Sequence, residues 1–324
     1  MANIKIYVAG HKGMLGSAIV RLLKKKNGVD IIIKDRSELD LTNQSSVENF
    51  FKVEKPDQVY MAAARVGGIG ANSTFSAEFI YENIIIEANI IHASFLSGVK
   101  KLLFLGSSSV YPKFVDQPIK EEELLKGPLE TTNEAYAIAK ISGIKMCEYY
   151  NNQYFSGHGI DYRSVVPTNL YGPGEHYDLN TSHVVPALIR KFHEAKIRNE
   201  RKVTVWGTGN PRREFLYVDD CAKACLYIMS LDHEIYNKTT KPFCSHINIG
   251  FGSDLTIKEL ANNIKDVINY SGEVEFDLSK PDGMKRKFID SKRIHDLGWR
   301  PEVSLKEGLK KTYEVFKKEY EKII

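Results

Sequence analysis

Short apolar segments alternate with amphipathic segments through the first half of the chain. The apolar segments, rich in β-branched residues, predict strands at 4–10, 30–35, 57–64, 101–107 and 161–167. Apolar residues at helical spacing predict helices at 15–26, 45–53, 76–97 and 136–150. Strands that are apolar nearly throughout suit a parallel sheet covered on both faces. The pattern therefore predicts an α/β fold of the Rossmann type, with a doubly wound parallel sheet.

The alternation becomes less regular after residue 167, where basic and aromatic residues are more frequent. A late apolar segment at 245–250 predicts one more strand of the first sheet, so the two lobes interleave along the chain. We expect a dinucleotide-binding domain over residues 1–170, completed by about 214–250. A smaller C-terminal α/β lobe, formed by 171–213 and 251–324, would bind the substrate.

Composition narrows the class of protein. The 324 residues are 43% hydrophobic and 27% charged, and the opening MANIKIYVAG resembles neither a signal peptide nor a membrane span. We therefore expect a cytoplasmic protein that does not contact a membrane. The net charge of +4 is spread along the chain, which argues against a nucleic-acid surface and suits a small anionic substrate. The four cysteines include no CxxC pair and no histidine at ligand spacing, so we expect no metal site.

Three glycines follow the first predicted strand in the segment VAGHKGMLGSAIVRLL. Gly10, Gly13 and Gly16 allow a tight turn, close approach of a pyrophosphate and close packing of the next helix. The N-terminus of that helix favours an anion. A strand before the loop, a helix after it and a second strand about 20 residues on are typical of a dinucleotide site.

The end of the second strand distinguishes the two nicotinamide cofactors. An acidic residue there binds a ribose 2′-hydroxyl, whereas an arginine accommodates a 2′-phosphate. The segment IIIKDRSELDL offers both Asp35 and Arg36, and Lys12 lies in the glycine loop. We interpret Arg36 with Lys12 as a clamp that favours NADP, with Asp35 as the contrary signal. Asp40 and Leu41 could border the adenine, although Asp40 could equally be a polar residue that flanks a helix.

The segment EAYAIAKISG places Tyr136 and Lys140 on one face of a predicted helix. A nearby ammonium stabilises a phenolate and lowers the pKa of a tyrosine, which can then protonate a carbonyl oxygen during hydride transfer. A reduced carbonyl also needs a hydrogen bond where negative charge develops. Ser107 comes directly after the strand residues LFLG and is the first candidate for that donor.

These motifs together resemble the extended short-chain dehydrogenase/reductase superfamily and, within it, the GDP-L-fucose synthase (GDP-4-keto-6-deoxymannose 3,5-epimerase-4-reductase) family. The segments that carry the resemblance are AAARVGGIGAN, GSSSVYPK, EAYAIAKISGIKMCEYYN, PTNLYGPG, SHVVPALIRKFHEA, VWGTGNPRREFLYVDD and KPDGMKRKFID. The resemblance implies an NADPH-dependent enzyme that epimerises C3 and C5 of a GDP-4-keto-6-deoxy-hexose and reduces C4. It places the reductase triad on Ser107, Tyr136 and Lys140.

The resemblance also implies the binding residues. Substrate contacts fall on Asn169, Lys191, Trp206, Arg213 and Lys287. Lys191 stands where an arginine is typical, which keeps the charge but loses a bidentate fork. The full set of expected cofactor contacts is Gly10, Lys12, Gly13, Met14, Leu15, Gly16, Arg36, Asp40, Leu41, Ala63, Lys140, Pro167 and His183.

The sequence departs from the family at Ser109. The family epimerises with a histidine, which carries over to His183, and a cysteine, whose position Ser109 occupies. An alcohol is several pKa units weaker as an acid than a thiol, which is on the order of 10 kcal/mol in forming the anion. We therefore expect a C4 reductase of a GDP-4-keto-6-deoxy-sugar, hexose or heptose, with weak or no epimerisation. Either a separate 3,5-epimerase acts before it or the sugar is reduced without inversion. The alternative is a full 3,5-epimerase-4-reductase in which Ser109 is tolerated, or His176 or water substitutes.

Three other classes fit less well. A sugar 4,6-dehydratase would place an acidic pair after the strand hydroxyl, where this chain has SSSVYP. A nucleotide-sugar 4-epimerase retains NAD, against which Arg36 argues. A catalytically silent NADP-binding regulator would lose Tyr136 or Lys140.

In the family, two helices pair across a two-fold axis, so we expect a homodimer formed by 77–96 and 136–151.

Overall fold

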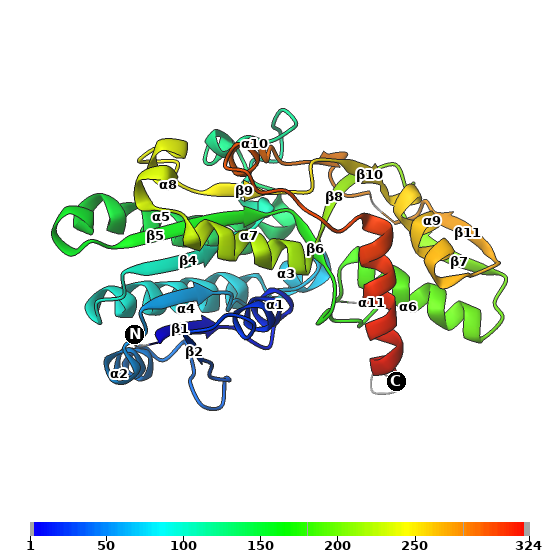
Figure 1. The fold of residues 1–324 in the computed structure, drawn as a ribbon. Helices are drawn as coiled ribbons and strands as arrows, with labels where there is room; N and C mark the ends of the chain where they lie inside the picture. Colours follow the sequence, from blue (N-terminus) through cyan, green and yellow to red (C-terminus); the bar gives the residue numbers. More distant parts are fainter. Residues whose placement is uncertain (1–2, 180, 281, 321–324) are drawn as a thin grey trace.

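A computed structural model describes residues 3–179, 181–280 and 282–320. Its centre is a six-stranded sheet in the order β2-β1-β3-β4-β5-β9, in which every neighbouring pair is parallel (Figure 1). The strands are β1 (Ile4–Ala9), β2 (Val29–Ile32), β3 (Gln58–Met61), β4 (Lys101–Leu105), β5 (Asp161–Pro167) and β9 (Ile247–Ile249). The predicted fold class is confirmed.

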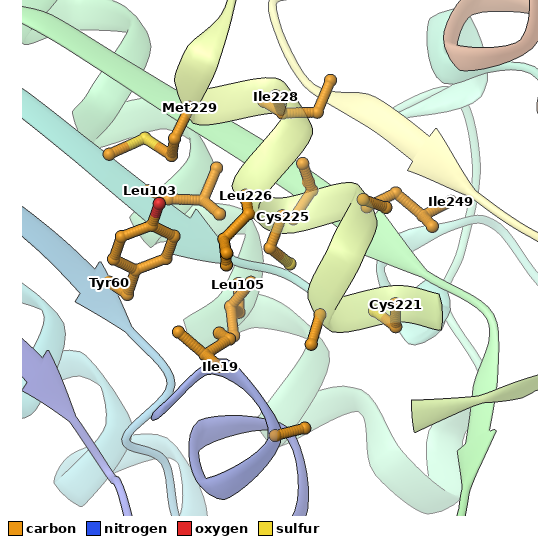
Figure 2. Packing of buried hydrophobic residues seen from close by; sticks show 14 of the residues in the cluster. Ile19, Tyr60, Leu103, Leu105, Cys221, Cys225, Leu226, Ile228, Met229 and Ile249 are labelled. Atoms are coloured by element: carbon orange, nitrogen blue, oxygen red, sulfur yellow. The ribbon is translucent and has the colours of Figure 1, made fainter. Parts of the chain in front are cut away.

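Helices cover both faces of this sheet. On one face, α1 (Met14–Leu23) and α7 (Val218–Ser230) pack on β1, β4 and β5 through one apolar cluster. Figure 2 shows Ile19 of α1 and Cys225 of α7 in this cluster, together with Tyr60 of β3 and Leu105 of β4. On the other face, α2 (Gln44–Glu54), α4 (Ser76–Leu96) and α5 (Glu134–His158) contribute to a second cluster. Both faces of the strands are therefore buried, as their continuous apolar character requires.

The strand order reverses beside β1. The chain crosses from β1 to β2 on one side, and then returns to place β3 on the other side of β1. In open parallel sheets, ligands bind in the crevice at the carboxyl ends of the strands where the order reverses. Gly10 and Ala62, which follow β1 and β3, lie at this point.

The second lobe has its own core and two small sheets. One contains β8 (Arg212–Tyr217) with β6 (Asn169–Tyr171), β10 (Asp254–Thr256) and β12 (Arg286–Lys287), and the other pairs β7 (Lys202–Trp206) with β11 (Glu273–Asp277). Three helices contribute to the core, α6 (Val184–Ile197), α9 (Ile257–Ile268) and α11 (Leu305–Glu319). Figure 1 shows this lobe beside the carboxyl end of the large sheet.

The remaining elements are short. They are α3 (Ile69–Thr74), α8 (His233–Thr239), α10 (Lys292–Asp296) and the 3-10 turns Ser108–Val110, Glu121–Glu123 and Thr131–Asn133. Within the described ranges, no helix is both long and apolar enough to cross a membrane.

Several predicted bounds were wrong. The helix predicted at 136–150 runs on to His158 and ends before Gly159, which adopts a left-handed conformation. Its apolar face continues because Tyr154 stacks on Phe95 of α4, with ring centroids 4.2 Å apart. The strands predicted to reach residues 35 and 64 end at Ile32 and Met61, because the following residues turn to form the walls of a cavity.

Candidate active site

A cavity of about 2380 Å³ lies at the carboxyl ends of β1, β3 and β4 and extends into the second lobe. Cavities for one small ligand are typically about 300–1,000 Å³, so this cavity has room for two ligands side by side. Every residue predicted to act on or bind the cofactor or the substrate lines it. The structure therefore brings the predicted site residues together, while their individual roles remain predictions.

The three loop glycines meet different neighbours. Gly10 has a φ of +79°, and a Cβ there would lie 2.6 Å from the backbone nitrogen of Ala63. A Cβ on Gly16 would lie 2.1 Å from the Gly10 carbonyl oxygen, whereas one on Gly13 would meet nothing closer than 3.4 Å. Gly10 and Gly16 therefore let the turn and the helix pack closely. Gly13 leaves its backbone open to the cavity, as an approaching pyrophosphate requires.

The carboxylate of Asp35 is held by its own turn. One Asp35 oxygen accepts hydrogen bonds from the backbone nitrogen and the hydroxyl of Ser37, at 3.0 and 2.6 Å. The other lies 3.0 Å from the Nζ atom of Lys12. These hydrogen bonds lower the pKa of Asp35, the largest contribution coming from Ser37. Asp35 thus closes the turn that presents Arg36. Because its carboxylate oxygens are engaged there, Asp35 is a weaker partner for a ribose hydroxyl.

Asp40 has a similar turn role. Its Oδ1 atom accepts hydrogen bonds from the backbone nitrogen and the hydroxyl of Thr42, at 3.0 and 2.7 Å. The N-cap of α2 is Asn43, whose side chain accepts from Ser46. Asp40 therefore shapes the loop before α2 and still lines the cavity beside Leu41.

The serine run begins directly after β4. Ser107 caps a 3-10 turn, and its Oγ atom accepts from the Ser109 backbone nitrogen at 3.3 Å. The Ser109 hydroxyl also donates to Ser107 Oγ, at 3.1 Å. A hydrogen bond between Ser107 and Tyr136 lowers the pKa of the tyrosine. The hydroxyls of Ser109, Ser107 and Tyr136 thus form a hydrogen-bonded chain that ends at the tyrosine.

Burial has a larger effect on Tyr136 than Lys140 does. Desolvation raises the pKa of Tyr136 and outweighs the lowering by the Lys140 ammonium, so the pKa is above its usual value. The expected net lowering of the Tyr136 pKa is therefore not found. The direction of the lysine's effect is as expected, and its Nζ atom lies 5.9 Å from the centroid of the Tyr136 ring.

A buried glutamate that was not predicted from the sequence lies behind Lys140. The Oε1 atom of Glu87, on α4, lies 3.1 Å from Lys140 Nζ, and both side chains are at most 3% exposed. Burial raises the pKa of Glu87 to about 7 despite the ammonium. The only signal in the sequence was an acidic residue within the apolar stretch YENIIIEANII.

The two histidines differ in position. His183 precedes α6 as its N-cap and lines the cavity, where desolvation by the surrounding protein lowers its pKa. The neutral imidazole can therefore accept a proton at neutral pH. The ring of His176 instead lies 3.2 Å from the Thr181 hydroxyl, and His176 is not among the described residues that line the cavity.

Cationic and aromatic groups line the far end of the cavity. Burial, followed by the charge of Arg213, lowers the pKa of Lys287 to about 8. Arg213 donates to the Met284 carbonyl oxygen at 2.6 Å, and the Asn169 side chain donates to the Glu214 carbonyl oxygen at 2.9 Å. These residues form a positive wall suited to a diphosphate.

Two lysines flank the Trp206 ring. Lys191 Nζ lies 5.3 Å from the ring centroid and Lys280 Nζ lies 5.4 Å from it. Lys191 also donates to the Thr204 carbonyl oxygen at 3.2 Å. A further pair that was not predicted from the sequence, Lys113 and Glu130, lines the same cavity and forms a 3.2 Å ion pair. The charge of Glu130 raises the pKa of Lys287 and so opposes part of the lowering caused by burial and Arg213.

Similarities to known proteins agree with this geometry. The NAD dependent epimerase/dehydratase family matches residues 6–250, and the chain belongs to this family. The chain is also 54% identical, over 316 residues, to a GDP-L-fucose synthase of Escherichia coli (strain K12), an alignment that covers 98% of this chain and 97% of that one. The predicted family resemblance is confirmed.

Two solved structures are similar along nearly their whole length. A GDP-6-OMe-4-keto-L-xylo-heptose reductase from Campylobacter jejuni has a TM-score of 0.92 and 41% identity, with 98% of this chain and 99% of that chain covered. A GDP-mannoheptose C4 reductase from Campylobacter jejuni with NADP bound has a TM-score of 0.87 and 42% identity, with the same coverage.

Proposed function

We propose that this protein is an NADPH-dependent reductase of the C4 ketone of a GDP-4-keto-6-deoxy-sugar, hexose or heptose, with weak or no 3,5-epimerase activity. The observation that carries the proposal is the chain of hydroxyls from Ser109 through Ser107 to Tyr136, with Lys140 beside it. Two groups of relatives, the GDP-L-fucose synthases and the GDP-heptose reductases, support the reduction of a GDP-sugar.

The residues around the glycine loop fit NADPH. Gly13 leaves room for a pyrophosphate at the start of α1, and Arg36 lines the cavity next to an Asp35 that is engaged by its own turn. An arginine in this place accommodates a 2′-phosphate. NADP is bound in the related mannoheptose C4 reductase. The cofactor supplies a hydride when bound.

The protein's own residues handle the proton and the developing charge. The Ser107 hydroxyl donates a hydrogen bond to the ketone oxygen, where negative charge develops during reduction. Tyr136 transfers its phenolic proton to that oxygen, and the Lys140 ammonium stabilises the phenolate that remains. The positive wall of Lys287 and Arg213 binds the diphosphate of the substrate.

Ser109 serves reduction in this proposal. Its hydroxyl donates to Ser107, which keeps a lone pair of Ser107 engaged and directs the Ser107 proton elsewhere. A thiol is a weak donor and would hold Ser107 less firmly. Epimerisation also needs a second acid or base besides His183, and His176 is bonded to Thr181. The pair of Ser107 and Ser109 therefore favours reduction without epimerisation.

Substrate reduction and proton exchange can be measured separately. We expect the enzyme to oxidise NADPH with at least one GDP-4-keto-6-deoxy-sugar from a panel of hexoses and heptoses. In D2O without NADPH, the wild type should incorporate deuterium at C3 and C5 slowly, and Ser109→Cys should incorporate it faster. Ser108→Cys is the matched control, because it adds a buried thiol one residue away.

The alternative is a bifunctional 3,5-epimerase-4-reductase. The 54% identity to a GDP-L-fucose synthase favours it, and His183 lines the cavity in either case. Rapid deuterium entry at both carbons in the wild type would establish this alternative and contradict the reductase-only proposal. Absence of NADPH turnover with every sugar of the panel would contradict both.

We also propose a cytoplasmic homodimer. The helices α4 and α5 pack against each other, and together they expose large apolar side chains, namely Tyr81, Leu96, Ile138, Tyr149 and Phe155. Sedimentation velocity of the wild type and of Tyr149→Glu would test this surface.

A further inference from the structure

Glu87 places a second charge next to the catalytic lysine. It lies on α4, whereas Lys140 lies on α5, and their 3.1 Å contact joins the two helices. Glu87 does not line the cavity, but Lys140 does. The carboxylate therefore lies on the protein side of the ammonium.

The fold makes specific room for this carboxylate. A Cβ added to Gly143 on α5 would lie 2.9 Å from Glu87 Oε2 and 2.2 Å from the ring of Phe104 on β4. Only a glycine at this turn of α5 admits both groups. The Phe104 ring in turn lies 4.8 Å from Lys140 Nζ. The ammonium is thus enclosed by a carboxylate and an aromatic ring.

The charges around Glu87 come from one helix. Among the described residues, Glu87 contributes to the pKa shifts of Lys140, Tyr136 and Cys147, all on α5. Phe104, which faces it from β4, carries no charge. A buried ammonium without a partner is strongly disfavoured, so Glu87 keeps Lys140 both charged and in place.

We propose that Glu87 is a positioning residue. It holds the Lys140 ammonium next to Tyr136 and sets the electrostatic environment of the tyrosine hydroxyl. This inference rests on the proposed reductase function. Glu87 does not touch the substrate, and it acts through Lys140. It extends the site by one residue, from Ser107, Tyr136 and Lys140 to a fourth member on a different helix.

The sign of the effect follows from electrostatics. The Glu87 carboxylate raises the pKa of both Tyr136 and Lys140. Whichever of the two groups loses its proton first, removal of the negative charge makes that loss easier. The alkaline pKa of the pair should therefore shift to lower pH when Glu87 is neutralised. A charge within about 4–6 Å shifts a pKa by roughly 1–3 units, so a shift of about one unit is expected.

The test compares the pH profiles of kcat for the wild type and Glu87→Gln, whose amide has nearly the same shape but no charge. Glu148→Gln is the matched control. Glu148 is another buried glutamate, on α5, and it contacts Lys145 at 2.6 Å rather than the site. Glu87→Gln should lower the alkaline pKa by about one unit, and Glu148→Gln should leave it unchanged. Glu87→Asp, which keeps the charge but retracts it, should lower the alkaline pKa by a smaller amount than Glu87→Gln does.

An unchanged alkaline pKa in a folded Glu87→Gln enzyme would overturn the proposal. If that variant does not fold, Glu87→Asp decides, because retraction of the carboxylate should still lower the pKa by a smaller amount. Equal profiles for Glu87→Asp and the wild type would then contradict it.

A second measurement needs no substrate. The pKa of Tyr136 is followed by NMR of protein labelled with 13Cζ-tyrosine, with Tyr136→Phe to assign the signal. If the wild type reduces none of the sugars, the proposed function fails. The NMR titration still shows whether Glu87 controls the charge state of Tyr136.

Discussion

The hydrogen bond between the two serine hydroxyls permits a quantitative prediction about reduction. The Ser109 and Ser107 Oγ atoms are 3.1 Å apart, and Ser109 contacts Ser107 through its backbone nitrogen as well. Ser109→Ala removes only the hydroxyl donor. One neutral hydrogen bond contributes about 1 kcal/mol, so kcat should fall by about fivefold. Ser107→Ala removes the donor to the ketone oxygen and should lower kcat by about 10²–10³.

The double variant distinguishes an indirect role of Ser109 from a direct one. If Ser109 acts only through Ser107, then the double variant Ser107→Ala with Ser109→Ala should reduce the keto-sugar no more slowly than Ser107→Ala alone. Stopped-flow NADPH oxidation under single-turnover conditions isolates the chemical step from product release. A further fivefold loss in the double variant would refute the reasoning, because Ser109 would then contact the reacting atoms itself.

Two further effects should be measurable at the cofactor and substrate ends of the cavity. Gly16→Ala places a Cβ 2.1 Å from the Gly10 carbonyl oxygen, so it should weaken NADPH binding in a fluorescence titration and lower the free energy of unfolding by about 1–3 kcal/mol. Gly157→Ala, where a Cβ meets nothing within 4 Å, is the control, and an equal loss there would contradict the steric argument. Lys287, with a pKa of about 8, is charged below that pH, so the KM for the GDP-sugar should rise as the pH increases above 8. Lys287→Gln should flatten that rise in initial-rate assays, and a persisting rise would assign it to another group.

The sequence predicted the features that depend on short spacings and on the geometry of parallel sheets. Gly10, Gly13 and Gly16 lie within seven residues of one another, and Tyr136 and Lys140 are four residues apart on one helix. Because parallel strands end at the same edge of a sheet, Ser107 after β4 necessarily lies near the glycine loop after β1. These relations hold without knowledge of any side-chain contact.

The sequence could not predict contacts that depend on how separate elements are rotated. Glu87 precedes Lys140 by 53 residues and meets it only because α4 and α5 pack with these faces together. The role of Asp35 depends on which way its carboxylate turns, which Ser37 and Lys12 determine. The balance at Tyr136 depends on burial, which the spacing of a motif does not reveal.

The position of β9 in the sheet has a consequence for synthesis on the ribosome. Its pairing partner β5 ends at Pro167, and β9 begins 80 residues later, at Ile247. Because synthesis proceeds at about 5–20 residues per second, the edge of β5 stays unpaired for roughly 4–16 s before β9 is made. The carbonyl groups of Ile228 and Leu231 that bind the buried Arg163 side chain also emerge in that interval. Nascent chains halted before residue 247 should therefore expose an unpaired strand edge, a feature that chaperones recognise.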